Sequence, residues 1–303
     1  MRPIQELTDT QARGVKYVLM DIDDTLTKEG KLVPEAYRAL WDLHSAGLRC
    51  IPVTGRPAGW CDLIARQWPV DAVVGENGAL VFWEEATTGG EGLPVLKQYF
   101  HPHAVRNSDP RLKDILTEVL QIDARLRVAK DQPFRLFDIA VDFAEEEPVL
   151  PLDTAVRVAE LARSHGAHAK VSSIHVNMWM GNYDKLSMAR DFLRERFGWD
   201  PAEGKEEVIF VGDSPNDEPM FAAFPLSCAV ANIRNYTHLI KHGPAFVADR
   251  DGGDGFAEIA EQLLSLRRGS GSSTGGSPIR NSIGNSAGTV HEDSRGGPRR
   301  EGL

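Results

Sequence analysis

Residues 15–27 read VKYVLMDIDDTLT, a short apolar run that ends abruptly in three carboxylates within four positions. An unbroken apolar run of this length is typical of a buried parallel strand. The carboxylates of Asp21, Asp23 and Asp24 repel one another, and a fold retains that cost most readily when a cation lies among them. The stretch therefore predicts a strand of a parallel sheet, with a site for a hard divalent ion such as Mg²⁺ at its carboxyl end.

Predicted helices and strands alternate along both flanks of the chain, before residue 84 and after residue 182. The first helix is predicted from apolar residues at helical spacing, with Pro34 at its start and Gly47 just past its end. Helices are expected near residues 34–46, 60–64, 184–197, 219–223, 236–241 and 255–266, and further strands near 48–54, 71–83, 206–214, 227–232 and 245–248. This alternation predicts an α/β fold, a parallel sheet between two layers of helices.

Between these flanks, the pattern changes to consecutive strands with two helices, which is typical of an α+β unit. The strands are expected near residues 94–100, 126–129, 136–143, 168–172 and 174–180, and the helices near 109–121 and 152–164. The C-terminal segment is rich in Gly and Ser and has almost no large apolar side chains, so we expect it to be a disordered tail. We predict a core domain from residues 1–83 and 183–267, an inserted domain at 84–182 and a tail at 268–303.

Composition limits the possible partners and location of the protein. The formal net charge of -10 argues against a nucleic acid or an anionic membrane surface as a partner. The three cysteines are an odd number without a C-x-x-C pair, which indicates neither a disulfide framework nor a zinc knuckle. No apolar stretch approaches the ~18 residues needed to span a bilayer. We expect a cytoplasmic protein, and the sequence does not indicate its oligomeric state.

Four short polar segments lie at the ends of predicted strands or at the start of the adjoining helix. They are DIDDT at residues 21–25, VTG at 53–55, Asp184 with Lys185, and GDSPND at 212–217. Each has a plain structural explanation taken alone: a capped turn, a strand end, a solvated helix residue or an acidic loop. Because the carboxyl ends of parallel strands meet at one edge of a sheet, the four together predict a single active site.

The order of these segments resembles the four motifs of the haloacid dehalogenase-like (HAD) superfamily. The insertion between the second and third motifs, with GENGA at residues 75–79, is similar to the Cof-type or IIB subfamily. The runs HVNMWMGNYDK at 175–185 and GDSPNDEPMF at 212–221 resemble mannosyl-3-phosphoglycerate phosphatases, although Leu186 stands where Gly commonly follows the Lys. The resemblance implies a Rossmann-like three-layer core under an inserted α/β cap.

The resemblance also implies a division of labour among the carboxylates. Asp21 would be the nucleophile that attacks phosphorus and forms an aspartyl-phosphate. Asp23 would protonate the leaving alcohol and then activate water, a step that a dehalogenase does not need. Mg²⁺ would be bound by Asp21, the backbone carbonyl of Asp23 and Asp213, with Asp217 as a further ligand or just behind the ligands.

The remaining motif residues would bind the phosphoryl group. The resemblance implies that Thr54 and the Gly55 amide position it, that Lys185 offsets its charge, and that Asn216 reaches the substrate. Three basic residues of the inserted domain are candidates for a second anionic group, with solvated surface as the plainer alternative for each: Arg127, Lys130 and Arg135.

These observations predict a Mg²⁺-dependent phosphatase of small phosphorylated metabolites, with sugar phosphates as the first class expected. The enzymatic alternative is a phosphomutase, which uses a similar aspartyl-phosphate but returns the phosphoryl group to a sugar. The non-enzymatic alternative is a HAD-like domain that binds a partner or ligand without catalysis, against which the four intact motifs argue.

Overall fold

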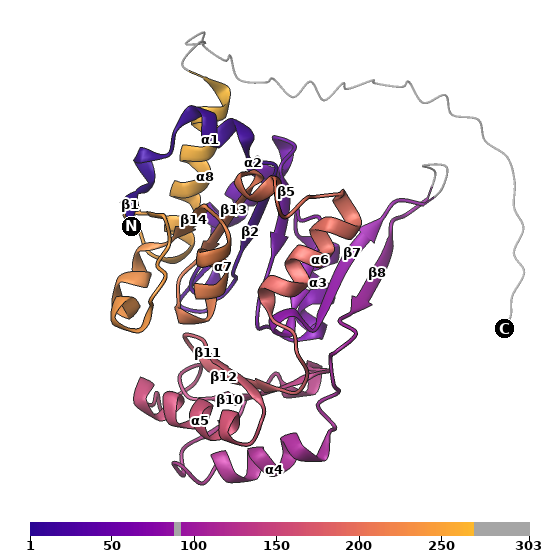
Figure 1. The fold of residues 1–303 in the computed structure, drawn as a ribbon, viewed down its shortest axis with the longest axis vertical. Coiled ribbons are helices and arrows are strands. Elements are labelled where there is room, and N and C mark those ends of the chain that lie inside the picture. Colours follow the sequence, from indigo (N-terminus) through magenta and orange to yellow (C-terminus); the bar gives the residue numbers. More distant parts are fainter. Residues whose placement is uncertain (88–91, 270–303) are drawn as a thin grey trace, which may run out of the picture. The chain divides into compact units, whose positions relative to one another are not determined.

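The computed structural model describes residues 1–87 and 92–269. Its centre is a parallel sheet with the strand order β1-β15-β14-β13-β2-β5 (Figure 1). The strands are β1 Arg2–Pro3, β2 Tyr17–Met20, β5 Arg49–Pro52, β13 Val208–Gly212, β14 Leu226–Ala229 and β15 Phe246–Val247. The predicted first strand, β2, pairs with β5 from its own half of the chain and with β13 from the other half. The predicted α/β class is confirmed.

Helices cover both faces of this sheet because its strands are apolar on both sides. Val18 and Met20 of β2 pack into one hydrophobic core, and Tyr17 and Leu19 pack into another on the opposite face. The first core includes residues of α1 Asp9–Gly14, α2 Pro34–Ser45, α3 Ala58–Gln67 and α8 Gly252–Arg268, and the second includes residues of α6 Lys185–Phe197 and α7 Glu218–Ala223. The result is the three-layer arrangement that the alternation predicts.

An antiparallel three-stranded sheet continues the core beyond β5. A bridge between Val53 and Val74 connects it, and its strands are β6 Val73–Gly75, β7 Leu80–Glu85 and β8 Val95–Phe100. The strand expected near residues 94–100, placed by the sequence in the inserted domain, therefore pairs with β7 instead. We use "core" for residues 1–100 and 183–269 and "cap" for residues 101–182.

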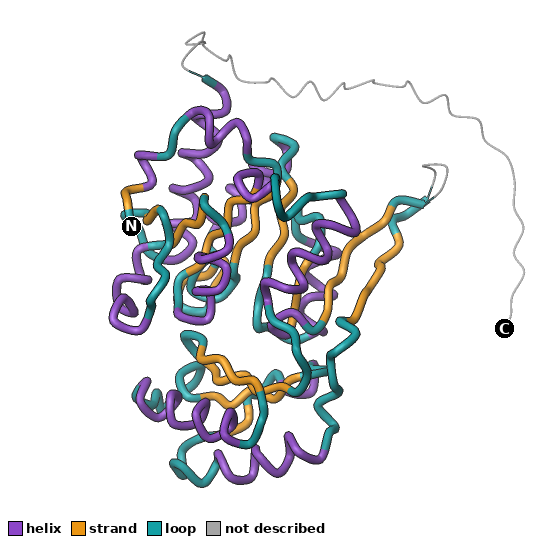
Figure 2. The backbone as a smooth tube through the Cα atoms, viewed as in Figure 1, coloured by secondary structure: helices purple, strands orange, loops and turns teal. Residues whose placement is uncertain are grey.

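The cap has its own antiparallel sheet, in the order β11-β12-β10-β9. Its strands are β9 Arg127–Val128, β10 Asp138–Asp142, β11 His168–Val171 and β12 His175–Trp179, and its helices are α4 Pro110–Val119 and α5 Leu152–Ser164. Alternate side chains such as Ile139, Val141 and Met178 pack against these helices. The other face of β10 and β12 carries polar side chains, among them Asp138, Asp142, His175 and Asn177. In Figure 2 the cap sheet lies between the core and the cap helices, so this polar face is directed toward the core.

Short elements complete the described chain. They are the hairpin of β3 Thr27–Lys28 and β4 Lys31–Leu32, and the 3-10 helices η1 Ile4–Glu6, η2 Glu76–Gly78, η3 Gln132–Phe134, η4 Gly204–Glu207, η5 Pro215–Asp217 and η6 Ala231–Leu239. The helix expected near residues 236–241 is part of this 3-10 segment, so its predicted type is wrong. None of the helices in the described ranges is long and apolar enough to cross a membrane.

Two glycines allow close backbone approaches beside the segment that returns from the cap to the core. Gly181 has a φ of +107°, and a Cβ there would overlap the carbonyl oxygen of His103. Gly78 has a φ of +104°, and a Cβ there would overlap the carbonyl oxygen of Asp184, the residue before α6. Both sites combine left-handed backbone with close approach, which only glycine tolerates well. Residues 1–269 form one compact unit, so the division into two domains stays a prediction, and all but residues 268 and 269 of the predicted tail lie outside the described residues.

Candidate active site

Three carboxylates meet at the carboxyl edge of the central sheet. Asp21 directly follows β2, Asp213 directly follows β13, and Asp217 ends η5. All three are buried, and each offers an oxygen within 4.8 Å of the others. Lys185, the first residue of α6, places its Nζ 3.0 Å from Asp21 Oδ2 and 2.9 Å from Asp217 Oδ1. Four of the predicted site residues are thus brought together by the ends of four separate elements, β2, β13, η5 and α6.

The cluster has more negative than positive groups, and burial acts on their protonation. Burial raises the pKa of Asp21 to about 7, Lys185 opposes this shift, and Asp217 and Asp23 add to it. Burial and the neighbouring carboxylates also raise the pKa of Asp213 well above its ordinary value. A hard divalent cation would supply the missing positive charge and prefers oxygen donors, so these residues fit Mg²⁺.

Hydrogen bonds fix the orientation of the carboxylates. Asp217 Oδ2 accepts the backbone N–H of Asp213 at 3.1 Å, while its Oδ1 accepts from Lys185. Thr25 donates its hydroxyl to Asp213 Oδ1 at 3.1 Å. A Cβ at Gly212 would lie 2.4 Å from Asp217 Oδ2, so glycine is needed there for the carboxylate to reach its place. Asp217 therefore orients Lys185 and the loop that carries Asp213.

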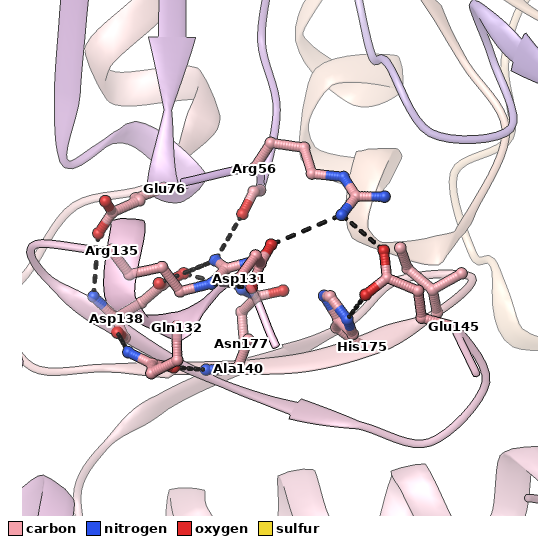
Figure 3. A network of polar contacts seen from close by, with 12 residues as sticks. Arg56, Glu76, Asp131, Gln132, Arg135, Asp138, Ala140, Glu145, His175 and Asn177 are labelled. Atoms are coloured by element: carbon pink, nitrogen blue, oxygen red, sulfur yellow. Dashed lines mark hydrogen bonds and ion pairs between the residues drawn. The ribbon is translucent and has the colours of Figure 1, made fainter. Parts of the chain in front are cut away.

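Asp23 belongs to the same loop as Asp21, but its carboxylate is held by a different partner. Arg56 donates from Nε at 2.9 Å and from Nη2 at 2.8 Å to the two oxygens of Asp23. The Nη1 of Arg56 lies 2.7 Å from Glu145 of the cap, and Glu145 in turn lies 2.8 Å from His175 Nε2 (Figure 3). The hydrogen bond with His175 lowers the pKa of Glu145 to about 2, and Arg56 contributes to the shift. Arg56 therefore connects the carboxylate of Asp23 to the cap.

The predicted phosphate-binding residues surround narrow cavities beside the cluster. Gly55 and Asn216 line one such cavity together with Asp21 and Asp23. Asn216 also lines a neighbouring one with Lys185. Thr54 is completely buried behind them, and its hydroxyl accepts the backbone N–H of Arg56 at 3.1 Å.

Comparisons with known proteins agree with this arrangement. A family model described as haloacid dehalogenase-like hydrolase matches residues 18–94, which include most of β2, all of β5 and the loops after them. A phosphoglycolate phosphatase from Pyrobaculum neutrophilum is 28% identical over 259 residues, 83% of this chain and 97% of that protein. Residues 18–94 are thus similar to the haloacid dehalogenase-like hydrolases. The resemblance inferred from the motifs is thereby confirmed.

Solved structures of low sequence identity share the fold of this hydrolase. A HAD/COF-like hydrolase from Plasmodium vivax has a TM-score of 0.62 at 16% identity and covers 87% of this chain and 99% of its own. A HAD subclass IIB sugar phosphatase has a TM-score of 0.56 at 14% identity and covers 83% of this chain and 100% of its own. These likenesses extend over the core and the cap together.

The hydrolase has a second polar network, at the contact between core and cap. Arg135 is buried between Asp131 and Asp138 and donates to the carbonyl oxygen of Gly55 at 2.8 Å (Figure 3). Although burial alone lowers the pKa of Arg135, these two carboxylates raise it above its ordinary value. The network fixes the backbone of the second motif from the cap side.

Glu76 of the GENGA run ties the same contact together. Its two oxygens accept the backbone N–H groups of Ala58, Leu136, Phe137 and Asp138, at distances from 2.6 to 3.1 Å. Three of these amides belong to the cap, whereas Glu76 belongs to the core. The run that resembled a family signature thus joins the two parts of the molecule.

The three basic residues considered for binding a second anionic group all form ion pairs with carboxylates of the cap. Arg127 pairs with Asp142 at 2.8 Å, and Lys130 is exposed and pairs with Glu146 at 2.8 Å. Arg135 belongs to the network with Asp131 and Asp138. The sequence reasoning missed Arg56 and Glu145 at the site. Arg56 had a local signal, because it directly follows VTG, whereas Glu145 had none.

Proposed function

We propose that this hydrolase is a Mg²⁺-dependent phosphatase that cleaves phosphate monoesters of small metabolites through an aspartyl-phosphate on Asp21. The observation that carries the proposal is the pairing of buried Asp21 with Lys185, close to Asp213, while Asp23 is held apart from them on the same loop. Two carboxylates in such different surroundings can take different parts in one reaction. Three free, buried cysteines fit a reducing compartment, and we propose the cytoplasm.

In the first step, an oxygen of Asp21 attacks phosphorus as the bond from phosphorus to the leaving oxygen breaks. Attack requires the ionised carboxylate, and the nearby ammonium of Lys185 favours that form. When bound, Mg²⁺ would be held by Asp21, Asp213 and the backbone carbonyl of Asp23 and would offset charge on the transferring phosphoryl group. Lys185 and the Gly55 amide would bind phosphoryl oxygens, and Thr54 would hold the turn that presents this amide.

Asp23 would move the protons in both steps. It gives a proton to the leaving oxygen, which departs as the alcohol, and then accepts a proton from the water that attacks the aspartyl-phosphate. The second attack releases inorganic phosphate and restores the Asp21 carboxylate. Arg56 holds Asp23 beside the cavity and would position it for both transfers.

The substrate would be a small phosphorylated metabolite of one of two classes. Sugar phosphates are one, and a structural relative is called a sugar phosphatase. Phosphorylated hydroxy acids are the other, since the Pyrobaculum neutrophilum relative is called a phosphoglycolate phosphatase. We propose no nucleic-acid or membrane partner, because the net charge of -10 disfavours both.

A phosphate-release screen tests the activity. The purified chain would be incubated with para-nitrophenyl phosphate, sugar phosphates and phosphorylated hydroxy acids, with Mg²⁺ or with excess EDTA. We expect release with Mg²⁺ and none with EDTA. Release from none of the esters would contradict the proposal, and turnover that requires a sugar bisphosphate would favour a phosphomutase.

A further inference from the structure

A cavity of about 180 Å³ lies between the cap and the core, next to the candidate active site. Helix α5 and strand β11 line it from the cap, and η5 and η6 line it from the core. A water molecule takes up about 30 Å³ in the liquid, so the cavity has the volume of roughly six waters. That volume suits the non-phosphoryl end of a two- or three-carbon metabolite.

The charged side chains that line this cavity are both cationic. They are Lys170 on β11 and Arg163 on α5, and no acidic residue accompanies them among the described lining residues. Neither forms an ion pair with any carboxylate in residues 1–87 and 92–269, whereas Arg127, Lys130 and Arg135 all do. Asp184 and Glu218 act on Lys170 through space, but neither forms an ion pair with it. Two cations that line one cavity without a salt bridge, in a chain with a net charge of -10, indicate a site for an anion.

Lys170 is the better placed of the two cations. It is half-buried, and burial lowers the pKa of its ammonium group, an effect to which Arg163 adds. Arg163 is exposed and donates to the carbonyl oxygen of Ala169 at 2.7 Å, which places its guanidinium beside the β11 backbone. A partly desolvated ammonium gains more from an anion than an exposed one does.

Asn216 connects this cavity to the reacting carboxylate. It lines the 180 Å³ cavity, the narrow cavity of Asp21 and Asp23, and the one that Lys170 shares with Lys185. Ser214 donates its hydroxyl to Asn216 Oδ1 at 2.7 Å, and Asn216 Nδ2 makes no hydrogen bond within the described residues. Strand β11 also contacts η5, which carries Asn216. A substrate with its phosphoryl group at Asp21 would therefore extend past Asn216 toward Lys170.

We propose that Lys170, assisted by Arg163, binds a carboxylate of the substrate and selects phosphorylated hydroxy acids over neutral sugar and polyol phosphates. This inference rests on the proposed phosphatase function, because it assigns the far end of the same substrate. The carboxylate would replace water around Lys170 with a charge-assisted hydrogen bond. The substrate carboxylate would reach Lys170 only when the phosphoryl group is bound at Asp21.

A pair of substrates that differ in one group tests the proposal. 3-Phosphoglycerate has a carboxylate where glycerol 3-phosphate has a hydroxymethyl group. We expect the wild type to show a kcat/KM at least about tenfold higher for 3-phosphoglycerate. In Lys170→Met, which keeps most of the side chain's length, that preference should fall about ten- to hundredfold, with glycerol 3-phosphate and para-nitrophenyl phosphate turned over as before.

Two further variants control the comparison. Lys170→Arg keeps the charge and should restore much of the preference. Lys113→Met removes an exposed lysine of α4 that does not line the cavity, and should leave the preference unchanged. An unchanged preference in Lys170→Met, with the enzyme otherwise active, would overturn the inference and leave the phosphatase proposal standing.

A binding measurement separates the two proposals if turnover is absent. Asp21→Asn with Mg²⁺ would be titrated calorimetrically with 3-phosphoglycerate, with and without Lys170→Met. We expect the added substitution to weaken binding at least about tenfold. Equal binding would overturn the role of Lys170, whereas a wild type without phosphatase activity would overturn only the proposed reaction.

Discussion

The carboxylate cluster on the core side and the Lys170 cavity on the cap side carry opposite charge. On the core side, Asp21, Asp213 and Asp217 surround a single lysine, Lys185. On the cap side, Lys170 and Arg163 line a cavity with no acidic partner among the described residues. A fold tolerates partly buried, unbalanced charge at a cost that a ligand removes. The difference teaches that a cation and a phosphoryl group fit the core side and an anion fits the cap side.

Asp21→Asn removes the atom on which the core side's proposed chemistry depends, and should have the largest effect. We expect kcat for para-nitrophenyl phosphate with Mg²⁺ to fall at least about 10³-fold, because the amide cannot form the phosphoryl ester. The melting temperature, measured in parallel, should not fall, since the substitution relieves repulsion among buried carboxylates. Activity within tenfold of the wild type would break the assignment of the chemistry to the core side.

Lys185→Met removes the cation that partly balances the core side. Two buried carboxylates lose their partner, so we expect the free energy of unfolding to fall by about 3–5 kcal/mol without Mg²⁺. Added Mg²⁺ should raise the melting temperature of this variant more than that of the wild type, because less positive charge opposes the ion. Equal increments in the two proteins would show that Lys185 and the metal do not share a site.

Glu76→Gln tests how the two sides are held against each other. The amide keeps one acceptor oxygen but turns an NH₂ group toward two backbone N–H donors. Loss of two hydrogen bonds to a charged acceptor should lower the free energy of unfolding by about 2–4 kcal/mol, measured in urea. Glu160→Gln, on the exposed face of α5, is the matched control and should change it little. A similar loss in both variants would remove Glu76 from this role.

Glu145→Gln should have the smallest effect, because Glu145 is only half-buried. Its pKa is lowered from an ordinary value of 4.5 to about 2, so the ionised form stabilises the fold above pH 4.5. That contribution, about 1–2 kcal/mol after allowance for solvent screening, is lost as the pH falls through 2. The difference in unfolding free energy between wild type and variant should shrink from pH 5 to pH 2. A constant difference would exclude an ionic role.

The core side of the site could be predicted from the sequence because its residues follow strand ends. Asp21 and Asp213 come directly after apolar runs, and the carboxyl ends of parallel strands meet at one edge whatever lies between them in the chain. Lys185 and Asp217 come with them, as the first residue of a helix and the end of a short turn. The position of the core side of the site therefore follows from the prediction of a parallel sheet.

The cap side could not be predicted in this way. Lys130 follows β9 and Lys170 lies within β11, and their local sequences do not show that one is paired with Glu146 and the other lines a cavity. Tertiary contacts decide this difference. The pairing of β8 with β7, and the 3-10 form of residues 231–239, also depend on contacts outside the local pattern.

The close approach of Gly181 to His103 has a consequence for engineering. The chain enters and leaves the cap at neighbouring points, so the cap is attached at what is nearly a single place. Residues 104–180 could therefore be exchanged for a foreign insert whose ends lie equally close together, provided that the insert replaces the cap amides that bind Glu76 and the cap partners of Gly55 and Arg56. A graft that restores these contacts would keep the carboxylate cluster of the core and replace only the part of the site that the cap supplies.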